Sequence, residues 1–197
     1  MQTAPNYGSE AQKGNVSIVR EETEKYVQSF DKKVEHFMEQ LKKIEFKCAD
    51  KNADKESIMR EVATATDSVL EACANFEREI GDERTVKTAQ AEFREKTNPI
   101  LSKSYGINRC RTWPQGYQGD YKTLEIAYKN ASMSNGIGYY LDKYLLSLPL
   151  GDAVRERIVK LADLLREELN HRRNPKVLDI ACGSCREIFD LIPEIKQ

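Results

Sequence analysis

The sequence has few of the features that mark nucleic-acid-binding proteins. It contains only two histidines in 197 residues, and its 31 Lys and Arg are balanced by 32 Asp and Glu, giving a formal net charge of -1. Proteins that bind nucleic acid through its phosphates need a basic face, and this balance shows no excess of positive charge. We therefore expect no nucleic-acid partner.

Long apolar runs are also missing. No uncharged apolar run approaches the roughly 18 residues that indicate a membrane-spanning helix. The first residues, beginning Met1-Gln-Thr-Ala-Pro, contain no basic segment followed by an apolar one, which a secretory leader requires. We expect a cytoplasmic protein without stable membrane insertion.

Cysteine is too sparse for a disulfide scaffold. The five cysteines are an odd number without the dense spacing of small secreted proteins. We expect reduced thiols and no disulfides. The cysteines are Cys48, Cys73, Cys110, Cys182 and Cys185.

Apolar residues recur at spacings of three and four from residue 21 to residue 80, with one interruption. This spacing places a continuous apolar stripe along one side of a helix. The first stripe consists of Val27, Phe30, Val34, Phe37, Leu41, Ile44 and Cys48. The second consists of Ile58, Val62, Ala65, Val69, Cys73, Phe76 and Ile80. We predict two antiparallel helices that are separated at Asn52-Ala-Asp-Lys, with Gly81 capping the second.

A third helix is predicted to start near Asp82 and to end before Pro99, because proline disfavours helical geometry in the preceding residue. A short restart over 100–105 would follow it. Residues 19–105 thus predict a helical bundle, and the polar, aperiodic residues 1–18 predict a disordered tail. The stripes form the core of this bundle or, alternatively, a coiled-coil surface for a homodimer.

Glycine and aromatic residues are interleaved over 106–150. The segment contains Trp113-Pro-Gln-Gly-Tyr-Gln-Gly-Asp-Tyr and later Asn135-Gly-Ile-Gly-Tyr-Tyr. Gly116 and Gly119 permit backbone conformations closed to other residues, and the aromatic rings supply apolar surface with a polar group. We interpret this segment as a lid or connector. A linking helix capped by Asp152 is predicted to follow over 151–174.

The residues from 176 onward carry the pattern with the clearest chemistry. Lys176-Val-Leu-Asp-Ile-Ala-Cys-Gly-Ser-Cys-Arg-Glu predicts a short buried strand, a tight turn of small residues and the start of a helix. The small residues Ala181, Gly183 and Ser184 let a ligand approach the backbone, and the following helix offers unpaired N–H groups. Such a strand-loop-helix is typical of nucleotide-binding sites.

This pattern resembles the first motif of class I S-adenosylmethionine (SAM) methyltransferases, a strand ending in an acidic residue before a Gly-x-Gly-x-Gly loop. Here it is Asp179-Ile-Ala181-Cys-Gly183-Ser-Cys185, so only the middle glycine is matched. With Trp113-Pro-Gln-Gly-Tyr, Gly138-Tyr-Tyr-Leu-Asp and Val154-Arg-Glu-Arg, the chain from about residue 85 resembles bacterial methyltransferases of extracellular-factor 3-hydroxypalmitic acid methyl ester biosynthesis.

The resemblance implies methyl transfer from SAM to the carboxylate of a small-molecule or fatty-acid acceptor. Esterifying a carboxylate needs no strong base, because the nucleophile is already ionised and alignment and water exclusion supply the catalysis. The resemblance also implies a cofactor site made by the loop and the residue before it. Its residues are Asp179, Ala181, Cys182, Gly183 and Cys185.

Three residues of the glycine-aromatic segment are candidates for the catalytic side. Tyr117, Asp120 and Tyr121 would form a lid or a wall of the acceptor pocket. For the tyrosines the alternative is packing between the bundle and the strand layer. No metal ligand set is expected, because Cys48, Cys73 and Cys110 provide no second close pair beside Cys182 and Cys185.

The predicted fold class is mainly α, with the helical bundle followed by the first strand-loop-helix of a Rossmann-like α/β methyltransferase domain over 175–197. A complete domain needs further strands, including one whose acidic end holds the ribose hydroxyls roughly 20 residues past the loop. We therefore expect an N-terminal fragment or a truncated protein. Its parent would be the enzyme, and the chain alone would be inactive and would not bind SAM.

Two alternative functions remain open. Cys182 and Cys185 form a C-x-x-C at a predicted strand-to-helix turn, which is the arrangement of thioredoxin-like redox proteins. The helical part could instead be a non-catalytic module for dimerisation or regulation.

Overall fold

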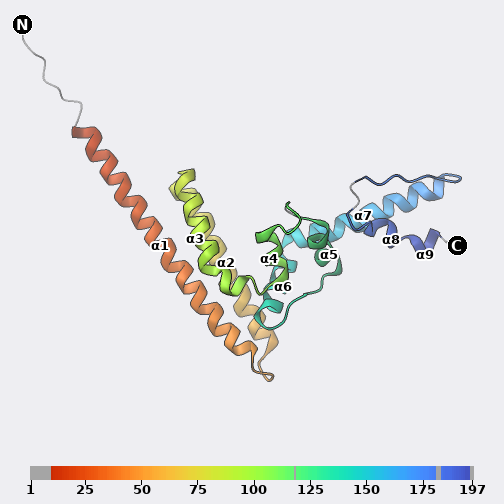
Figure 1. Ribbon diagram of the computed structural model, residues 1–197, viewed down its shortest axis with the longest axis horizontal. Helices are drawn as coiled ribbons and strands as arrows, with labels where there is room; N and C mark the ends of the chain where they lie inside the picture. The colour runs from red at the N-terminus through yellow and green to blue at the C-terminus, as the bar shows by residue number, and fades with distance from the viewer. Residues whose placement is uncertain (1–9, 118, 181–182, 196–197) are drawn as a thin grey trace, which may run out of the picture.

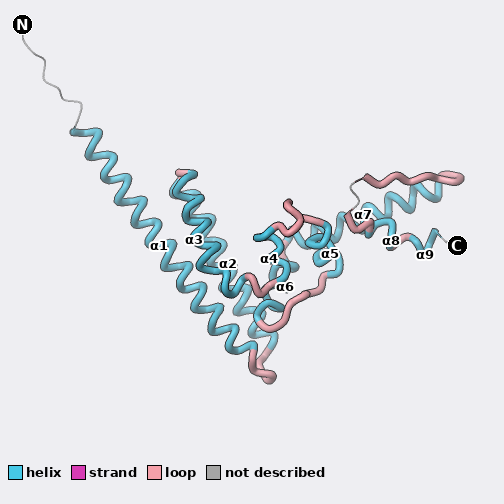
Figure 2. Tube along the Cα trace, in the orientation of Figure 1, coloured by secondary structure: helices cyan, strands magenta, loops and turns pink. Residues whose placement is uncertain are grey.

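The computed structural model describes residues 10–117, 119–180 and 183–195, and within these ranges every regular element is a helix. Figure 2 shows helices joined by loops, without a strand in the described parts of the chain. The mainly α prediction is therefore confirmed. None of the helices in these ranges is both long enough and apolar enough to cross a membrane.

Three helices form the N-terminal bundle, α1 (Glu10–Cys48), α2 (Lys55–Ile80) and α3 (Glu83–Leu101). α1 and α2 lie side by side and run antiparallel through a tight turn, as predicted (Figure 1). α2 ends at the predicted Gly81 cap and begins within the predicted break at Asn52-Ala-Asp-Lys. The Asp54 carboxylate accepts a hydrogen bond from the backbone N–H of Glu56 at 3.0 Å, and Gly81 ends the helix with a φ of 63°.

The predicted apolar stripes form the core of the bundle. Leu41 and Val62 have no exposed surface, and Phe37 is only 2% exposed. Phe30 and Phe76 stack with ring centroids 4.5 Å apart at the end of the bundle away from the α1–α2 turn. The periodicity of the sequence thus identified the buried faces of α1 and α2.

Two helix boundaries differ from the prediction. α1 already begins at Glu10, so residues 10–18 of the expected tail are helical; residues 1–9 lie outside the described ranges. Once a packed segment has nucleated a helix, adding turns at its end has little cost. α3 continues through Pro99 to Leu101, because the burial of Ile100 and Leu101 offsets the backbone hydrogen bond that the proline cannot donate.

The segment over 106–150 is more ordered than a lid or connector. It contains α4 (Tyr105–Thr112), α5 (Tyr121–Lys129) and α6 (Ile137–Ser147). α6 belongs to the bundle core through Ile137, Leu141 and neighbouring tyrosines. A Cβ added at Gly138 would lie 2.2 Å from the backbone oxygen of Lys103, so this close approach requires glycine.

The Asp142 carboxylate holds this segment together. It is 1% exposed and accepts hydrogen bonds from two backbone N–H groups, those of Gly106 at 3.0 Å and Met133 at 3.1 Å. Three hydroxyls also donate to it, and they belong to Ser104, Ser132 and Ser134. These bonds join the start of α4, the loop before α6 and α6 itself. A buried carboxylate with this many donors fixes the positions of all three segments.

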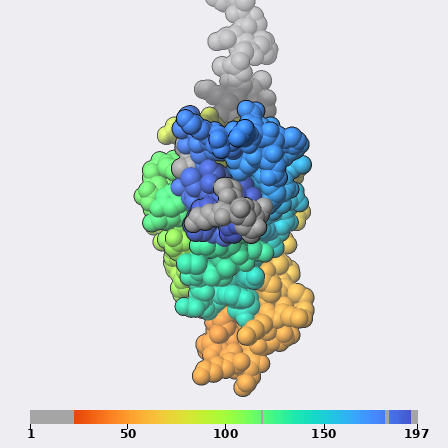
Figure 3. Space-filling view, turned by 90° about the vertical axis from the view of Figure 1, so that its right-hand side faces the viewer, coloured from red at the N-terminus to blue at the C-terminus, as the bar shows by residue number. Residues whose placement is uncertain are grey.

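The C-terminal part extends away from the bundle (Figure 1). It contains α7 (Pro149–His171), α8 (Arg186–Phe189) and α9 (Ile192–Ile195), and the chain doubles back along α7 after residue 171. Figure 3 views this end, where α7 and the residues after it lie at the surface. α7 begins at Pro149 rather than being capped by Asp152, because proline is preorganised for the first helical position.

The predicted strand before the loop is not formed. Residues 175–180 are irregular, and Val177, Leu178 and Ile180 are 51%, 83% and 79% exposed. A β-strand is completed by hydrogen bonds to a neighbouring strand, and no other strand exists in the described ranges. The buried Rossmann strand expected here is therefore absent from the described chain.

Candidate functional site

A cavity of about 260 Å³ lies where α5, α7 and the loop after residue 178 meet. Four of the predicted site residues line it, namely Tyr117 and Tyr121 from the glycine-aromatic segment and Asp179 and Gly183 from the predicted cofactor motif. These two groups are about 60 residues apart in the sequence. The fold thus brings together two sets of residues that were predicted separately.

α5 presents one side to this cavity. Tyr121, Leu124 and Tyr128 line it, at the spacing of three and four that places residues on one side of a helix. Asp120 starts the helix, because its carboxylate accepts hydrogen bonds from the backbone N–H groups of Lys122 at 2.9 Å and Thr123 at 3.1 Å. The positions of Tyr121 and Tyr128 therefore depend on this helix cap.

Asp120 itself does not line the cavity. It is 1% exposed and forms an ion pair with Arg109 of α4, with an Nη2 to Oδ2 distance of 2.5 Å. Burial alone raises the pKa of Asp120, but hydrogen bonds from Arg109 and the backbone of Thr123 outweigh it, so the pKa lies below its usual value. The structure thus places this predicted catalytic residue in a buried contact between α4 and α5.

The predicted tyrosines are at the rim. Tyr117 is 55% exposed and Tyr121 is 37% exposed, so neither ring is packed in the core. Across the cavity, Arg157 of α7 donates a hydrogen bond to the Tyr128 hydroxyl at 2.9 Å. The wall therefore carries aromatic faces and one guanidinium.

The described part of the loop lies against α5. Gly183 has a φ of +59°, and a Cβ added there would come within 3.2 Å of the Tyr121 Cβ. A side chain at this position would be strained and crowded. The Cys185 thiol donates to the Asp179 carboxylate at 3.5 Å. Ala181 and Cys182 lie outside the described residues, so the predicted C-x-x-C is seen only at Cys185.

Glu125 connects the loop to α5. Burial alone raises the pKa of Glu125, but hydrogen bonds from Lys129 and Ser184 outweigh it and lower the pKa. The Lys129 Nζ lies 3.0 Å from the Glu125 carboxylate. Ser184 is a loop residue and Glu125 a helix residue, so the loop comes close to α5 beside the tyrosines.

Sequence reasoning missed four residues of this region as site residues. Tyr128 and Arg157 line the cavity, Glu125 lies beside the loop, and Arg109 pairs with Asp120. The helical spacing from Tyr121 through Glu125 to Tyr128 could have identified two of them. Nothing in the linear pattern indicated Arg109 or Arg157, which approach only in the folded chain.

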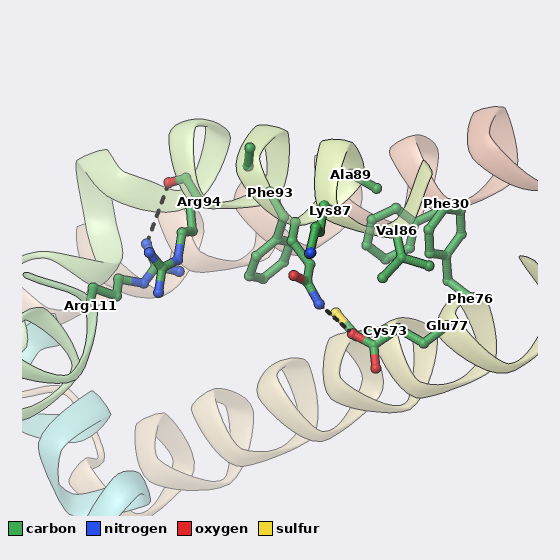
Figure 4. Close-up of a pocket in the computed structure, with 12 residues that line it drawn as sticks. Phe30, Cys73, Phe76, Glu77, Val86, Lys87, Ala89, Phe93, Arg94 and Arg111 are labelled. Carbon is green, nitrogen blue, oxygen red and sulfur yellow. Dashed lines mark hydrogen bonds between the residues drawn. The ribbon is translucent and has the colours of Figure 1, made fainter. Parts of the chain in front are cut away.

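A second hollow, of about 640 Å³, lies between α2 and α3. Figure 4 shows Phe93 and Val86 facing it, with Arg111 at one end and a hydrogen bond of 2.9 Å from Gln90 to Glu77 across it. None of the predicted site residues lines this hollow, and its buried aromatic residues belong to the bundle core. It is larger than the first cavity but carries none of the predicted chemistry.

No group of His, Cys, Asp and Glu side chains in the described ranges is arranged to hold a metal ion. Comparisons of the chain with protein-family models, with curated proteins and with solved structures found no match.

Proposed function

We propose that this chain carries the helical module and the first cofactor loop of a SAM-dependent methyltransferase that acts on a carboxylate acceptor. The observation that supports the proposal is the shared cavity of Tyr117, Tyr121, Asp179 and Gly183. The loop residues are predicted to bind the cofactor, and the tyrosines to form the acceptor wall. These two predictions rest on different parts of the sequence. A methyl donor and its acceptor must meet in one site, which is the arrangement this cavity offers.

The residues around the loop fit the methionine part of SAM. Asp179 and Glu187 both line the cavity and can accept hydrogen bonds from an ammonium group. Gly183 lets the loop lie close to Tyr121 at the cavity, and the faces of Tyr117 and Tyr121 attract a cation. SAM, when bound, supplies a methyl group on a sulfonium that an ionised carboxylate attacks directly.

On the acceptor side the chain positions the carboxylate and excludes water. Arg157 is the cation of the cavity wall, and an arginine can hold a carboxylate through two parallel hydrogen bonds. The tyrosines cover the site without donating or removing a proton from the acceptor. The catalysis is therefore by alignment, and no histidine is needed for it.

The size of the cavity agrees with a partial site. Small-molecule sites usually measure about 300 to 1,000 Å³, and this cavity is about 260 Å³. We expect residues 1–197 alone not to bind SAM, in contrast to a protein in which further strands enclose the loop.

The test is isothermal titration of SAM into the protein expressed from its complete reading frame. We expect micromolar binding that Asp179→Ala weakens about tenfold or more through the loss of a charge-assisted hydrogen bond. Asp190→Ala is the matched control, because Asp190 follows α8, pairs with Arg186 and does not line the cavity. No binding, or equal losses in both variants, contradicts the proposal.

Cysteine variants of the same protein distinguish methyl transfer from the thioredoxin-like redox function. Replacing Cys182 and Cys185 by Ser should leave methyl transfer measurable, because the family fills these loop positions with small residues. If the unmodified protein reduces insulin and the replacements abolish this activity, the result would support the thioredoxin-like function instead.

A further inference from the structure

A basic groove runs between α1 and α2. It consists of two hollows of about 760 Å³ and 280 Å³ that share Gln40 and Ala65. The hollows extend along α1 from Ser29 to Lys47, which is about 27 Å at 1.5 Å per residue. We call this surface the α1–α2 groove.

The charge of the groove differs from that of the whole chain. Six Lys or Arg side chains line it, against one acidic side chain, Glu61. The chain as a whole has 31 basic and 32 acidic residues, so the imbalance is local. Glu61 is paired with Lys47 at 2.7 Å, and Arg60 lies 3.9 Å from Asp54 and 3.8 Å from Glu56, so the remaining positive charge comes from the four other lysines. The basic residues are Lys32, Lys33, Lys42, Lys43, Lys47 and Arg60.

Two acidic residues of α1 form ion pairs on a face of the helix that does not line the α1–α2 groove. Asp31 pairs with Lys96 of α3 at 2.8 Å, and Glu45 pairs with Lys103 at 2.6 Å. Lys33 and Lys43 lie on a different face of the helix, and they make no ion pair with any residue that the structure describes. Their charge is therefore available to a partner.

The shape of the groove favours a helix over a flat or extended partner. Two helices packed side by side leave a furrow that accepts the side chains of a third helix. The α2 edge carries the small residues Thr64, Ala65 and Ser68, which permit close approach. Phe46 lies at one end and is 84% exposed, so it offers an apolar contact that a phosphate backbone would not use.

We propose that the α1–α2 groove binds an amphipathic helix of a partner protein that carries Asp and Glu along its polar face. The acidic side chains face Lys33 and Lys43, and an apolar side chain packs on Phe46. The length of the groove corresponds to about 18 residues of such a helix. This inference is independent of the cofactor cavity, which lies at the other end of the fold (Figure 1).

The probe is a fluorescent 18-residue helical peptide with Leu on one face and Glu on the other, and binding to the full chain is followed by anisotropy. We expect saturable binding that weakens as salt is added. The double variant Lys33→Glu/Lys43→Glu should weaken binding about tenfold or more, and Phe46→Ala should weaken it independently. Lys160→Glu, a single change of sign at an exposed residue of α7, should leave binding unchanged.

Circular dichroism of each variant checks that the bundle is intact. Equal weakening by Lys160→Glu, or undiminished binding to the double variant, would overturn the proposal. So would equal affinity for a peptide with Lys in place of Glu. Tighter binding to single-stranded RNA or to anionic phosphatidylserine vesicles than to the acidic peptide would assign the groove to a different partner and reject this one.

Discussion

The N-terminal bundle and the C-terminal arm, residues 149–195, contain helices with similar amphipathic patterns but very different burial. In the bundle, Leu41 and Val62 have no exposed surface. In α7, all of which is described, no residue is buried, although its apolar residues also recur at helical spacing; of the arm's other described residues only Leu191, 2% exposed, is buried. An apolar stripe therefore predicts a helix more reliably than it predicts what the helix packs against.

Several apolar side chains of the arm are exposed to solvent. Leu164 on α7 is 50% exposed, and Leu178 and Phe189 beyond it are 83% and 63% exposed. Apolar area stabilises a fold by roughly 25 cal/mol per Å² only when it is removed from water. The arm consequently contributes far less to the free energy of unfolding than the bundle does.

The largest expected effect contrasts these two regions directly. Phe37→Ala should lower the free energy of unfolding by about 3 to 5 kcal/mol, because the ring is 2% exposed in the bundle core. Leu164→Ala in α7 truncates an apolar side chain that is 50% exposed and should cost about 1 kcal/mol or less. Urea denaturation measures both. Similar losses in the two variants would show that α7 is packed in solution.

The next effect concerns the contact between α4 and α5. Asp120→Asn should destabilise the chain by about 3 kcal/mol, because Arg109 would be left as a buried charge without its carboxylate. Asp163→Asn, in an exposed ion pair with Arg166, should change stability by less than about 1 kcal/mol. An unchanged midpoint for Asp120→Asn in urea denaturation would contradict a structural role for this residue.

The same ion pair predicts a pH dependence. The pKa of Asp120 is lower in the folded chain than its usual value of about 3.9. Its contribution is therefore fully present above that value and is lost as the pH falls through the lower folded pKa. Below about pH 4 the difference in stability between the wild-type chain and Asp120→Asn should shrink. A constant difference down to pH 2 would argue against the ion pair.

A smaller effect is expected where α6 meets the bundle. Gly138→Ala should destabilise the chain by about 1 to 3 kcal/mol, because the added Cβ would lie 2.2 Å from the Lys103 backbone oxygen and the helix must shift. Tyr139→Phe, at the adjacent and 41% exposed position, serves as the control and should be nearly neutral. Thermal melting distinguishes the two. Equal melting temperatures would place α6 farther from the bundle than the structure does.

The smallest stability effect is expected at the cavity rim. Tyr117→Ala should change stability by less than about 1 kcal/mol, since the side chain is 55% exposed. Because the ring covers the acceptor in the proposed site, its removal should slow single-turnover methyl transfer by the complete protein. Tyr26→Ala on α1, 46% exposed and remote from the cavity, is the matched control and should leave turnover unchanged. Normal turnover in Tyr117→Ala would remove it from the site.

The bundle could be predicted from local signals, and the middle of the chain could not. Gly81 ends α2 and Asp82 begins α3 at the predicted positions, and Asp54, which caps the start of α2, lies in the predicted break. Such caps can be predicted because they act through neighbouring backbone groups. α4 to α6 are short and depend on Asp142 and on the Arg109–Asp120 pair, whose partners are distant in sequence. Short helices are marginal alone, so no local pattern identified them.

The candidate site, too, could be predicted only in part from local signals. Of the residues that the sequence predicts for the site, Tyr117, Tyr121, Asp179 and Gly183 are among those that line the cavity, and Cys185 is not. The sequence also assigned Asp120 to the site, where the structure instead has a buried cap and ion pair. A carboxylate looks the same in either role until its partner is known, and Arg109 is 11 residues away.

By itself, the sequence determined the helical bundle, its buried stripes and the positions of its caps, because these depend on the spacing of side chains along one helix and on hydrogen bonds between near neighbours. Only the tertiary structure decided which residues meet in the cavity, that Gly138 lies against Lys103, and that residues 175–180 remain irregular. Each of these outcomes depends on groups brought together from distant positions. A strand in particular requires another strand beside it, and its own residues cannot supply one.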